Sequence, residues 1–318
     1  MQGRKNTLKR LKRKEGFIRR LKKSFRKDWQ LYLLSLPILI YVIIFSYVPM
    51  YGIKIAFEDY NPSRGFFNNE WVGFKYFLKF FRNRQFWPVM RNTLVLGFYG
   101  LTAGFFPPII LAILLHNTMN KKFKSIVQTI SYAPHFISVV VMSGMIILMF
   151  SQSAGVVNTI IAALGGERKN FMADPNLFPH IYVWSGVWQG MGWWSIIYLS
   201  ALTGADQQLY EAAKVDGANR LQRIIHLDIP AIFPTAVIML IMNCGSILTS
   251  NTQKVLLLQN DLNLRTSEII GTLVYKSGLM NMQYSYSTAV GLFQTIVNVI
   301  FLVSVNKISG KLSETSLW

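Results

Sequence analysis

Acidic residues, cysteine and charge within the apolar runs are all scarce in this sequence. Its 318 residues include 14 Asp and Glu against 33 Lys and Arg, which gives a formal net charge of +19. The single cysteine, Cys244, excludes an intramolecular disulfide, and its place inside an apolar run predicts a small buried thiol. Most basic residues have no acidic residue to pair with, so their position along the chain becomes informative.

Motifs that bind nucleotides or metals are also missing. No Gly-x-x-x-x-Gly-Lys-Ser/Thr occurs, because Gly310-Lys311 is followed by Leu312 and lacks the upstream glycine. There is no His-Glu-x-x-His and no Gly-x-Ser-x-Gly, and the four histidines are scattered over different segments: His116, His135, His180 and His226. We therefore expect no catalytic residue, no metal site and no cofactor in this chain, and any ATP hydrolysis to occur on another chain.

Apolar residues make up 52% of the chain, and they gather in six runs of the length needed to cross a membrane. A spanning helix needs about 20 mostly apolar residues. The runs extend over approximately Trp29–Ile53, Asn92–Leu115, Ile126–Phe150, His180–Leu202, Ala231–Ser250 and Tyr286–Val305. We therefore predict an all-α, polytopic membrane protein with six transmembrane helices.

Ionisable residues are nearly absent from these runs. Carriers driven by protons or ions usually keep such a residue in mid-membrane, and His135 beside Pro134 is the only candidate. No internal repeat is detectable either, which further disfavours a stand-alone carrier.

Residues 1–28 form a basic arm ahead of the membrane domain, which covers residues 29–318. The arm could bind nucleic acid, bind acidic lipid headgroups or hold the N-terminus in the cytoplasm. Because it directly precedes a hydrophobic span, the positive-inside rule favours the last two roles. The first run has no small-residue cleavage site, so we predict a span and not a signal peptide.

With the N-terminus inside, residues 117–125, the loop 203–230 and the tail from Asn306 are predicted to lie in the cytoplasm. Lysines crowd the first of these loops, as the positive-inside rule requires. Of the outward loops, the one from Lys54 to Arg91 has aromatic spacing that predicts an amphipathic helix around Phe74–Phe81. In the loop 251–285, the apolar run 254–258 is too short to span and is predicted to be extended or re-entrant.

A polar interval at 204–230 separates the fourth and fifth runs and has the pattern of ordered helices. Asp206 is predicted to cap a helix over Gln207–Val215, Asp216-Gly217 to form a turn, and a second short helix to end at Pro230. A helix-turn-helix that binds DNA would share this pattern. Local charge argues against DNA, because acidic residues offset the basic ones and a phosphate-binding surface should be basic.

The order Glu211-Ala212-Ala213, Gly217 six residues after the glutamate, and Ile229-Pro230 at the end resembles the cytoplasmic "EAA" loop of permease subunits of ATP-binding-cassette (ABC) importers. In that family the loop docks into a cleft on the ATPase subunit. The resemblance implies that Glu211 pairs with a basic ATPase residue, that Ala212 and Ala213 allow close docking, and that Asp216-Gly217 makes the sharp turn.

The chain also resembles carbohydrate permeases of this family along nearly its whole length. Segments 272–279, 283–293 and 306–309 are similar to the C-terminal part of permeases that serve polysaccharide or complex-oligosaccharide importers of Gram-positive bacteria. In the maltose-type permease, sugar contacts lie on the spans that flank the coupling loop. The same offsets from Glu211 imply a substrate path lined by Gly190, Trp193, Asn243, Ser246, Ile247 and Ser250, of which the last four recur at helical spacing.

We therefore predict a permease subunit that imports oligosaccharides or polysaccharide fragments across a bacterial cell membrane, with both termini in the cytoplasm. The resemblance implies a second homologous permease, two ATPase subunits that bind ATP and Mg²⁺, an extracellular solute-binding lipoprotein and membrane lipids as partners, and no nucleic acid. The alternative is a polytopic membrane enzyme acting on lipid-linked sugars, for which Glu58, Asp59 and Asp174 are outward acidic candidates.

Overall fold

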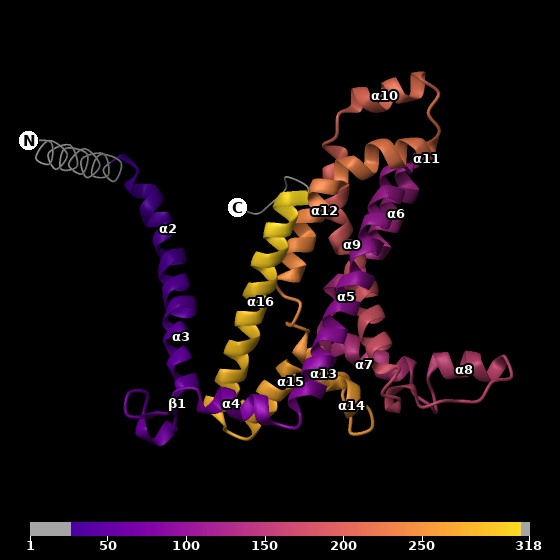
Figure 1. Ribbon diagram of the computed structural model, residues 1–318. Coiled ribbons are helices and arrows are strands. Elements are labelled where there is room, and N and C mark those ends of the chain that lie inside the picture. The colour runs from indigo at the N-terminus through magenta and orange to yellow at the C-terminus, as the bar shows by residue number, and fades with distance from the viewer. Residues whose placement is uncertain (1–26, 313–318) are drawn as a thin grey trace, which may run out of the picture. The chain divides into compact units, whose positions relative to one another are not determined.

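The computed structural model describes residues 27–312, and nearly all of its regular structure is helical, as predicted (Figure 1). Contacts between Cα atoms divide the chain into two compact units, residues 1–55 and 56–318. The predicted basic arm lies outside the described residues, apart from Lys27 and Asp28.

The first unit contains one long apolar helix whose winding changes along its length. It comprises α2 (Trp29–Val42), a π-helical turn (Ile43–Tyr47), α3 (Val48–Met50) and a 3₁₀ stretch (Tyr51–Phe57) that runs into the second unit. Together they form a run of 29 residues, long and apolar enough to cross a membrane. The wider π-helical turn precedes Pro49, which cannot donate a backbone hydrogen bond. This helix coincides with the predicted first span.

The second unit is built around long helices that alternate in direction. They are α5 (Phe86–His116), α6 (Lys121–Tyr132), α7 (Val139–Met149), α9 (Phe178–Thr203), α12 (Ile229–Cys244) and α16 (Tyr284–Leu312). Short elements connect them: β1 (Glu58–Asp59), β2 (Glu70–Trp71), α4 (Lys75–Arg82), α8 (Val156–Ala163), α10 (Gln207–Val215), α11 (Arg220–Arg223), α13 (Thr252–Leu258), α14 (Leu264–Ser267) and α15 (Ile270–Tyr275). The remaining turns are 3₁₀ (Pro62–Arg64, Ala133–Phe136, Phe171–Ala173) or π-helical (Ile224–Asp228, Lys276–Met280). In Figure 1, α10 and α11 lie at one end of this unit, and α4, α13, α14 and α15 lie at the other.

Close packing of α9 against α6, and of α5 against the chain that follows α12, depends on glycine at two contact points. A Cβ atom at Gly192 in α9 would lie 2.0 Å from the carbonyl oxygen of Ser131 in α6. A Cβ atom at Gly97 in α5 would lie 2.1 Å from the carbonyl oxygen of Ile247, just beyond α12. Any side chain at either position would therefore push two backbones apart. Small residues at helix contacts are typical of membrane proteins, where they let helices approach closely.

An apolar cluster joins α5, α9 and α12 near the end of the unit that carries α10. It consists of buried side chains from all three helices: Ala112, Leu115, Tyr198, Leu199, Leu202, Ile232 and Ala236. A second cluster joins α5, α7, α9 and α13 toward the opposite end: Leu96, Met142, Ile146, Phe178, Ile181, Val255, Leu258 and Ile269. The two clusters hold α5 and α9 in register over most of their length.

The third predicted span is not one continuous helix, so that part of the prediction is wrong. Two helical pieces, residues 121–136 and Val139–Met149, meet at an angle of 101°. Pro134 lies in the 3₁₀ turn between them, and Ser138 starts α7 by accepting a hydrogen bond at Oγ from the backbone N–H of Val141. The bend follows from sequence, since a proline and a serine cap one turn later both interrupt an α-helix.

Four helices within residues 27–312 are long and apolar enough to cross a membrane, or five if the bent pair forms one span. The predicted fourth span corresponds to α9, which has 26 residues and therefore the required length. Its tryptophans, glycines and polar residues lower its hydropathy, and it is not among those four helices. The predicted count of six thus requires both α9 and the bent pair to count as spans.

The predicted amphipathic helix before the second span is present as α4. Phe80 is buried and packs with Phe86, Tyr286 and Phe293, so α4 lies against α16. The exposed face of α4 carries Lys75 and Lys79.

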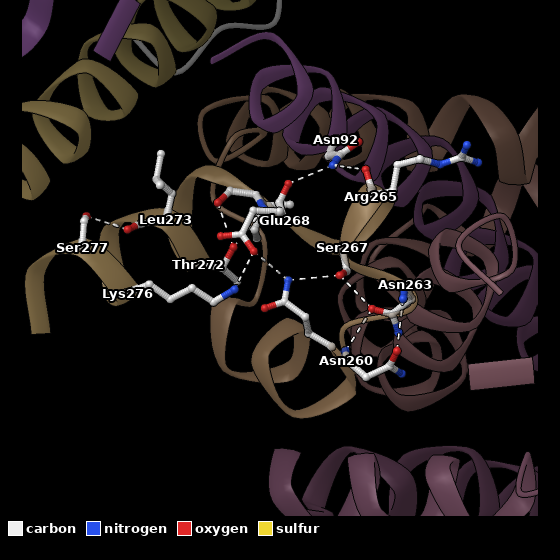
Figure 2. A network of polar contacts seen from close by, with 12 residues as sticks. Asn92, Asn260, Asn263, Arg265, Ser267, Glu268, Thr272, Leu273, Lys276 and Ser277 are labelled. Carbon is white, nitrogen blue, oxygen red and sulfur yellow. Dashed lines mark hydrogen bonds and ion pairs between the residues drawn. The ribbon is translucent and has the colours of Figure 1, made fainter. Parts of the chain in front are cut away.

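In the segment 251–285, the apolar run 254–258 was predicted to be extended or re-entrant. It is not extended, because these residues belong to the helix α13. Buried polar side chains hold the following turns together (Figure 2). Ser267 donates from Oγ to Asn263 Oδ1 at 2.8 Å, and Lys276 Nζ contacts Glu268 Oε2 at 2.6 Å. Asn92 of α5 donates from Nδ2 to the carbonyl oxygens of Arg265 and Glu268, each at 2.9 Å. The segment is therefore tied to α5 by satisfied polar contacts.

Candidate functional site

The loop 204–230 begins as predicted, with a capped helix. Asp206 accepts a hydrogen bond at Oδ1 from the backbone N–H of Gln208 at 2.9 Å, and α10 covers Gln207–Val215. Glu211 and Ala212 are exposed on α10, whereas Ala213 is half-buried. The glutamate and the first alanine are therefore presented to a partner, and the second alanine faces back toward the loop.

The turn after α10 requires glycine. Gly217 has φ of +77°, a conformation that is strained for residues with a Cβ atom. The backbone N–H of Ala218 donates to the carbonyl oxygen of Ala213 at 2.8 Å, and that of Gly217 donates to Lys214 at 3.2 Å. This is the Schellman arrangement that closes a helix through a left-handed residue. The predicted Asp216-Gly217 turn is confirmed.

Pro230 does not end the second helix, so that prediction is wrong. Asn219 and Gln222 form a capping box that starts α11, and the helix then continues from Arg220 to Cys244 over 25 residues. The π-helical turn Ile224–Asp228 directly precedes Ile229-Pro230. A π-helical turn shifts the hydrogen-bond ladder, which lets the chain pass a residue that lacks a backbone N–H. The loop is thus rigidly joined to α12.

A buried carboxylate beneath α10 connects it to two spans. Asp228 is 0% exposed and accepts hydrogen bonds from Tyr210 Oη at 2.7 Å and from Asn117 Nδ2 at 2.6 Å. His116 Nε2 lies 4.0 Å from Asp228 Oδ1. Burial and the hydrogen bond to Asp228 both raise the pKa of Tyr210, so its hydroxyl stays protonated and can donate. We define Tyr210, Asn117 and Asp228 as the carboxylate pad.

The sequence did not reveal the carboxylate pad. In the sequence, Asp228 is one of the acidic residues that offset the basic ones in the loop 204–230. The signal was an acidic residue inside an otherwise apolar turn, because such a carboxylate must find hydrogen-bond donors when it is buried. The donors themselves lie 18 and 111 residues away.

A cavity of about 400 Å³ lies between α5, α9 and the end of α12. Five of the six predicted path residues line it: Gly190, Asn243, Ser246, Ile247 and Ser250. Gln189 and Trp194 of α9 line it as well, and α5 contributes the glycines at 97, 100 and 104. Amide, hydroxyl and indole groups around a glycine-lined wall can bind the hydroxyl edges and apolar faces of a sugar. Whether a sugar passes here remains a prediction.

Trp193, the sixth predicted path residue, does not line this cavity. Its ring stacks on His135 with centroids 4.4 Å apart and planes 2° from parallel. The contact lies at the bend between α6 and α7, so Trp193 packs against the bent pair. His135, the one ionisable residue noted within the apolar runs, thus packs against an indole ring at the bend.

Comparison with known protein families identifies the family of this chain. Residues 108–313 match the family described as the binding-protein-dependent transport system inner membrane component. The chain belongs to this family. The matched region contains the carboxylate pad, the loop 204–230 and the whole cavity lining from α9 onward.

Relatives in this family are similar over nearly the full chain. Protein LplB of Bacillus subtilis (strain 168) is 41% identical over 295 residues, which cover 93% of this chain and 93% of that protein. The polygalacturonan/rhamnogalacturonan transport system permease protein YteP of the same strain is 40% identical over 310 residues, 98% of this chain and 95% of that protein.

Two solved structures share the fold of this permease. A chain of a bacterial ABC transporter that imports the acidic polysaccharide alginate has a TM-score of 0.86 and 36% identity, covering 92% of this chain and 99% of that chain. A chain of the bacterial alginate ABC transporter in complex with an alginate pentasaccharide-bound periplasmic protein has a TM-score of 0.85 and 35% identity, with coverage of 93% and 99%.

The predicted identity is therefore confirmed: the chain is a membrane permease subunit of an ABC importer of the sugar-transporting kind, with an EAA loop. Such subunits are not enzymes, and the alternative of a membrane enzyme acting on lipid-linked sugars is not supported. The DNA-binding and stand-alone carrier alternatives are not supported either.

Proposed function

We propose that this permease moves an oligosaccharide through the central cavity when the loop 204–230 transmits closure of an ATPase dimer. The observation that carries the proposal is the single helix Arg220–Cys244, which begins in that loop and ends with Asn243 in the cavity wall. ATP-driven closure moves α10, the attached helix moves with it, and the bundle changes from inward to outward access.

The exposed surface of the loop supports docking to an ATPase. Leu209, Val215 and Leu221 are 56%, 88% and 64% exposed although the loop is polar overall. Apolar side chains gathered on an otherwise polar surface often mark a protein contact. In the proposed complex they enter the ATPase cleft, Glu211 pairs with a basic residue there, and Ala212 lets the two backbones approach.

The assembly and its orientation follow from the same docking. The α10 end of the second unit faces the cytoplasm, which also places the end of α16 there, and the N-terminus is proposed to lie on the same side. The partners are a second homologous permease, two ATPase subunits holding ATP and Mg²⁺, an extracellular solute-binding lipoprotein and membrane lipids. The similar alginate transporter in complex with a periplasmic protein supports the binding protein.

The substrate is proposed to be an oligosaccharide that contains uronic acids. YteP is named for polygalacturonan and rhamnogalacturonan, and the similar structures belong to an alginate transporter. Galacturonan and alginate are both polymers of uronic acids, which carry a carboxylate on each sugar. Residues of the cavity lining, such as Asn243 and Ser246, suit the hydroxyl groups that all these sugars share.

The test uses the complex of this permease with its partner subunits in proteoliposomes. Tetragalacturonate delivered by the binding protein should stimulate ATP hydrolysis and accumulate inside, whereas binding protein without sugar should give little stimulation. Maltotetraose serves as the neutral comparison. An assembled complex that hydrolyses ATP but transports no sugar from a panel of acidic and neutral oligosaccharides would contradict the proposed function.

Replacing Asn243 with alanine tests the cavity as the sugar path. The loss of one neutral hydrogen bond is worth about 0.5–1.5 kcal/mol, so KM for uptake should rise about three- to tenfold while the ATPase subunits still assemble. Thr295→Ala is a matched control, because Thr295 is exposed on α16 and bonds only to the carbonyl oxygen of Gly291. Unchanged uptake kinetics in the Asn243 variant would remove this residue from the path.

A further inference from the structure

Lys254 gives the central cavity its only charged lining residue among those the structure describes. It lies on α13, at the end of the second unit opposite α10 (Figure 1), and is 4% exposed. The remaining lining residues are apolar, glycine, aromatic, amide or hydroxyl. A lone buried ammonium group in an otherwise uncharged wall needs an explanation, because burying an unpaired charge is costly.

Protein contacts account for only part of what this ammonium group can bind. Nζ donates to the carbonyl oxygen of Tyr182 at 3.0 Å and lies 5.1 Å from the centroid of the Tyr182 ring. Within residues 27–312, no carboxylate lies within 4.0 Å of it. An ammonium group has three N–H donors, so two of them have no acceptor in the part of the chain that the structure describes.

A second lysine in this region, Lys276, is only partly buried and does have a carboxylate partner. Lys276 is paired with Glu268 at 2.6 Å, and Glu268 is held in turn by Gln259 (Figure 2). Where the fold needs a lysine for its own stability, it thus supplies a carboxylate. Lys254 has none, although it is more deeply buried than Lys276.

The Nζ atom of Lys254 approaches α9 closely at a glycine. Gly186, which also lines the cavity, presents no side chain, and a Cβ atom there would lie in van der Waals contact, 3.5 Å from Nζ. Burial lowers the pKa of Lys254 to about 8, so most of the group still carries its charge at neutral pH. The ammonium group is therefore charged, short of acceptors and part of the cavity wall.

We propose that Lys254 binds a carboxylate of the transported sugar, which makes it the residue that selects acidic oligosaccharides in the cavity. The inference rests on the proposed function. A uronate carboxylate supplies the acceptor that the wall lacks, and the amide and hydroxyl groups deeper in the cavity are left for the sugar hydroxyls. A single point charge without a second cation binds the acid without holding it too tightly for release.

The test compares two sugars with the same backbone, tetragalacturonate and its methyl ester, in which a methyl group on each carboxyl removes the charge. Transport of each is measured with the full complex carrying wild-type permease or Lys254→Met, and each variant value is divided by the wild-type value. Because all complexes share one binding protein, its own preference cancels in this ratio. The ratio for the acid should fall about tenfold or more, as expected for loss of a charged hydrogen bond, while the ratio for the ester should change less than about twofold.

Three further variants separate charge from packing. Lys254→Gln lacks the charge but can still donate to the Tyr182 carbonyl oxygen. It should show the same selective loss of acid transport as Lys254→Met, and it provides the test if the methionine variant assembles poorly. Lys254→Arg keeps the charge and should retain most of the preference for the acid. Lys79→Met removes an exposed positive charge from α4 outside the cavity and should change neither ratio.

A binding experiment repeats the comparison without the binding protein. Both sugars are titrated onto the detergent-solubilised complex, so that only the permease and its partner subunits can select between them.

The outcomes distinguish this inference from the proposed function. Equal losses for acid and ester in the Lys254 variants would overturn the role of Lys254 and leave the sugar importer in place. Wild-type transport of neutral oligosaccharides alone would do the same. An assembled complex that transports none of these sugars would contradict the proposed function and the inference together.

Discussion

Gly217→Val should abolish sugar uptake while leaving the permease in the membrane. A β-branched residue at φ of +77° is strained by about 1–3 kcal/mol, so the turn after α10 relaxes to another conformation. The change acts through the backbone, because a Cβ atom at Gly217 would meet nothing within 4 Å. Since α10 and α11 meet at this turn, their relative direction changes and docking to the ATPase is lost. Uptake into proteoliposomes should fall at least about tenfold, with unstimulated ATP hydrolysis retained.

Two comparison variants make this result specific. Gly165 also has a positive φ, +84°, with nothing within 4 Å of a Cβ atom, but it lies after α8 and far along the chain from the loop. Gly165→Val should therefore carry similar local strain and transport normally. Gly217→Asn should retain intermediate uptake, because asparagine tolerates this conformation better than other residues with side chains. Normal uptake by Gly217→Val would argue against coupling through this turn.

Tyr210→Phe should uncouple ATP hydrolysis from transport. The substitution removes the hydroxyl that donates to Asp228 at 2.7 Å, a charged hydrogen bond worth about 1.5–3 kcal/mol, or roughly 10- to 150-fold in an equilibrium. The bond is the link from α10 back to the helix that begins at Arg220, so α10 should move without carrying that helix along. The number of sugars transported per ATP should fall about tenfold, whereas the ATPase subunits should still bind.

The matched control is a tyrosine–aspartate pair on the other side of the protein. Tyr76 donates from Oη to Asp59 Oδ1 at 2.6 Å, which gives the same donor and acceptor groups as the Tyr210–Asp228 bond, but outside the loop and with an exposed carboxylate. Tyr76→Phe should leave the sugar-to-ATP ratio unchanged. An equal fall in both variants would mean that loss of any tyrosine–aspartate hydrogen bond, and not loss of the carboxylate pad, caused the effect.

Local signals predicted the coupling loop well. The cap at Asp206, the helix of nine residues and the left-handed glycine at 217 each depend on residues that are neighbours in sequence. Such features can be predicted because the hydrogen bonds involved span five residues or fewer. The identity of the family followed from the same short stretch.

Features that depend on tertiary contact were predicted poorly. Pro230 has a strong tendency to end a helix, but the π-helical turn before it lets the helix continue. Trp193 has the right offset from Glu211 to line the path, yet its ring turns toward His135 at a bend that the hydropathy pattern did not reveal. The place of Lys254 in the cavity wall was not predicted, because the run 254–258 was interpreted only from its short length. The positions of Trp193 and Lys254 were decided by contacts with residues distant in sequence, His135 and Tyr182.

Because Arg220–Cys244 is one continuous helix, the docking loop and the cavity wall should move together as a lever arm. At 1.5 Å per residue, Asn243 lies about 22 Å along this arm from Asp228. A tilt of about 5° around the carboxylate pad would shift the cavity end by about 2 Å, enough to break a hydrogen bond to a sugar. Motion of the ATPase would then set the tilt angle of this helix, and the same tilt angle would determine whether the sugar is released.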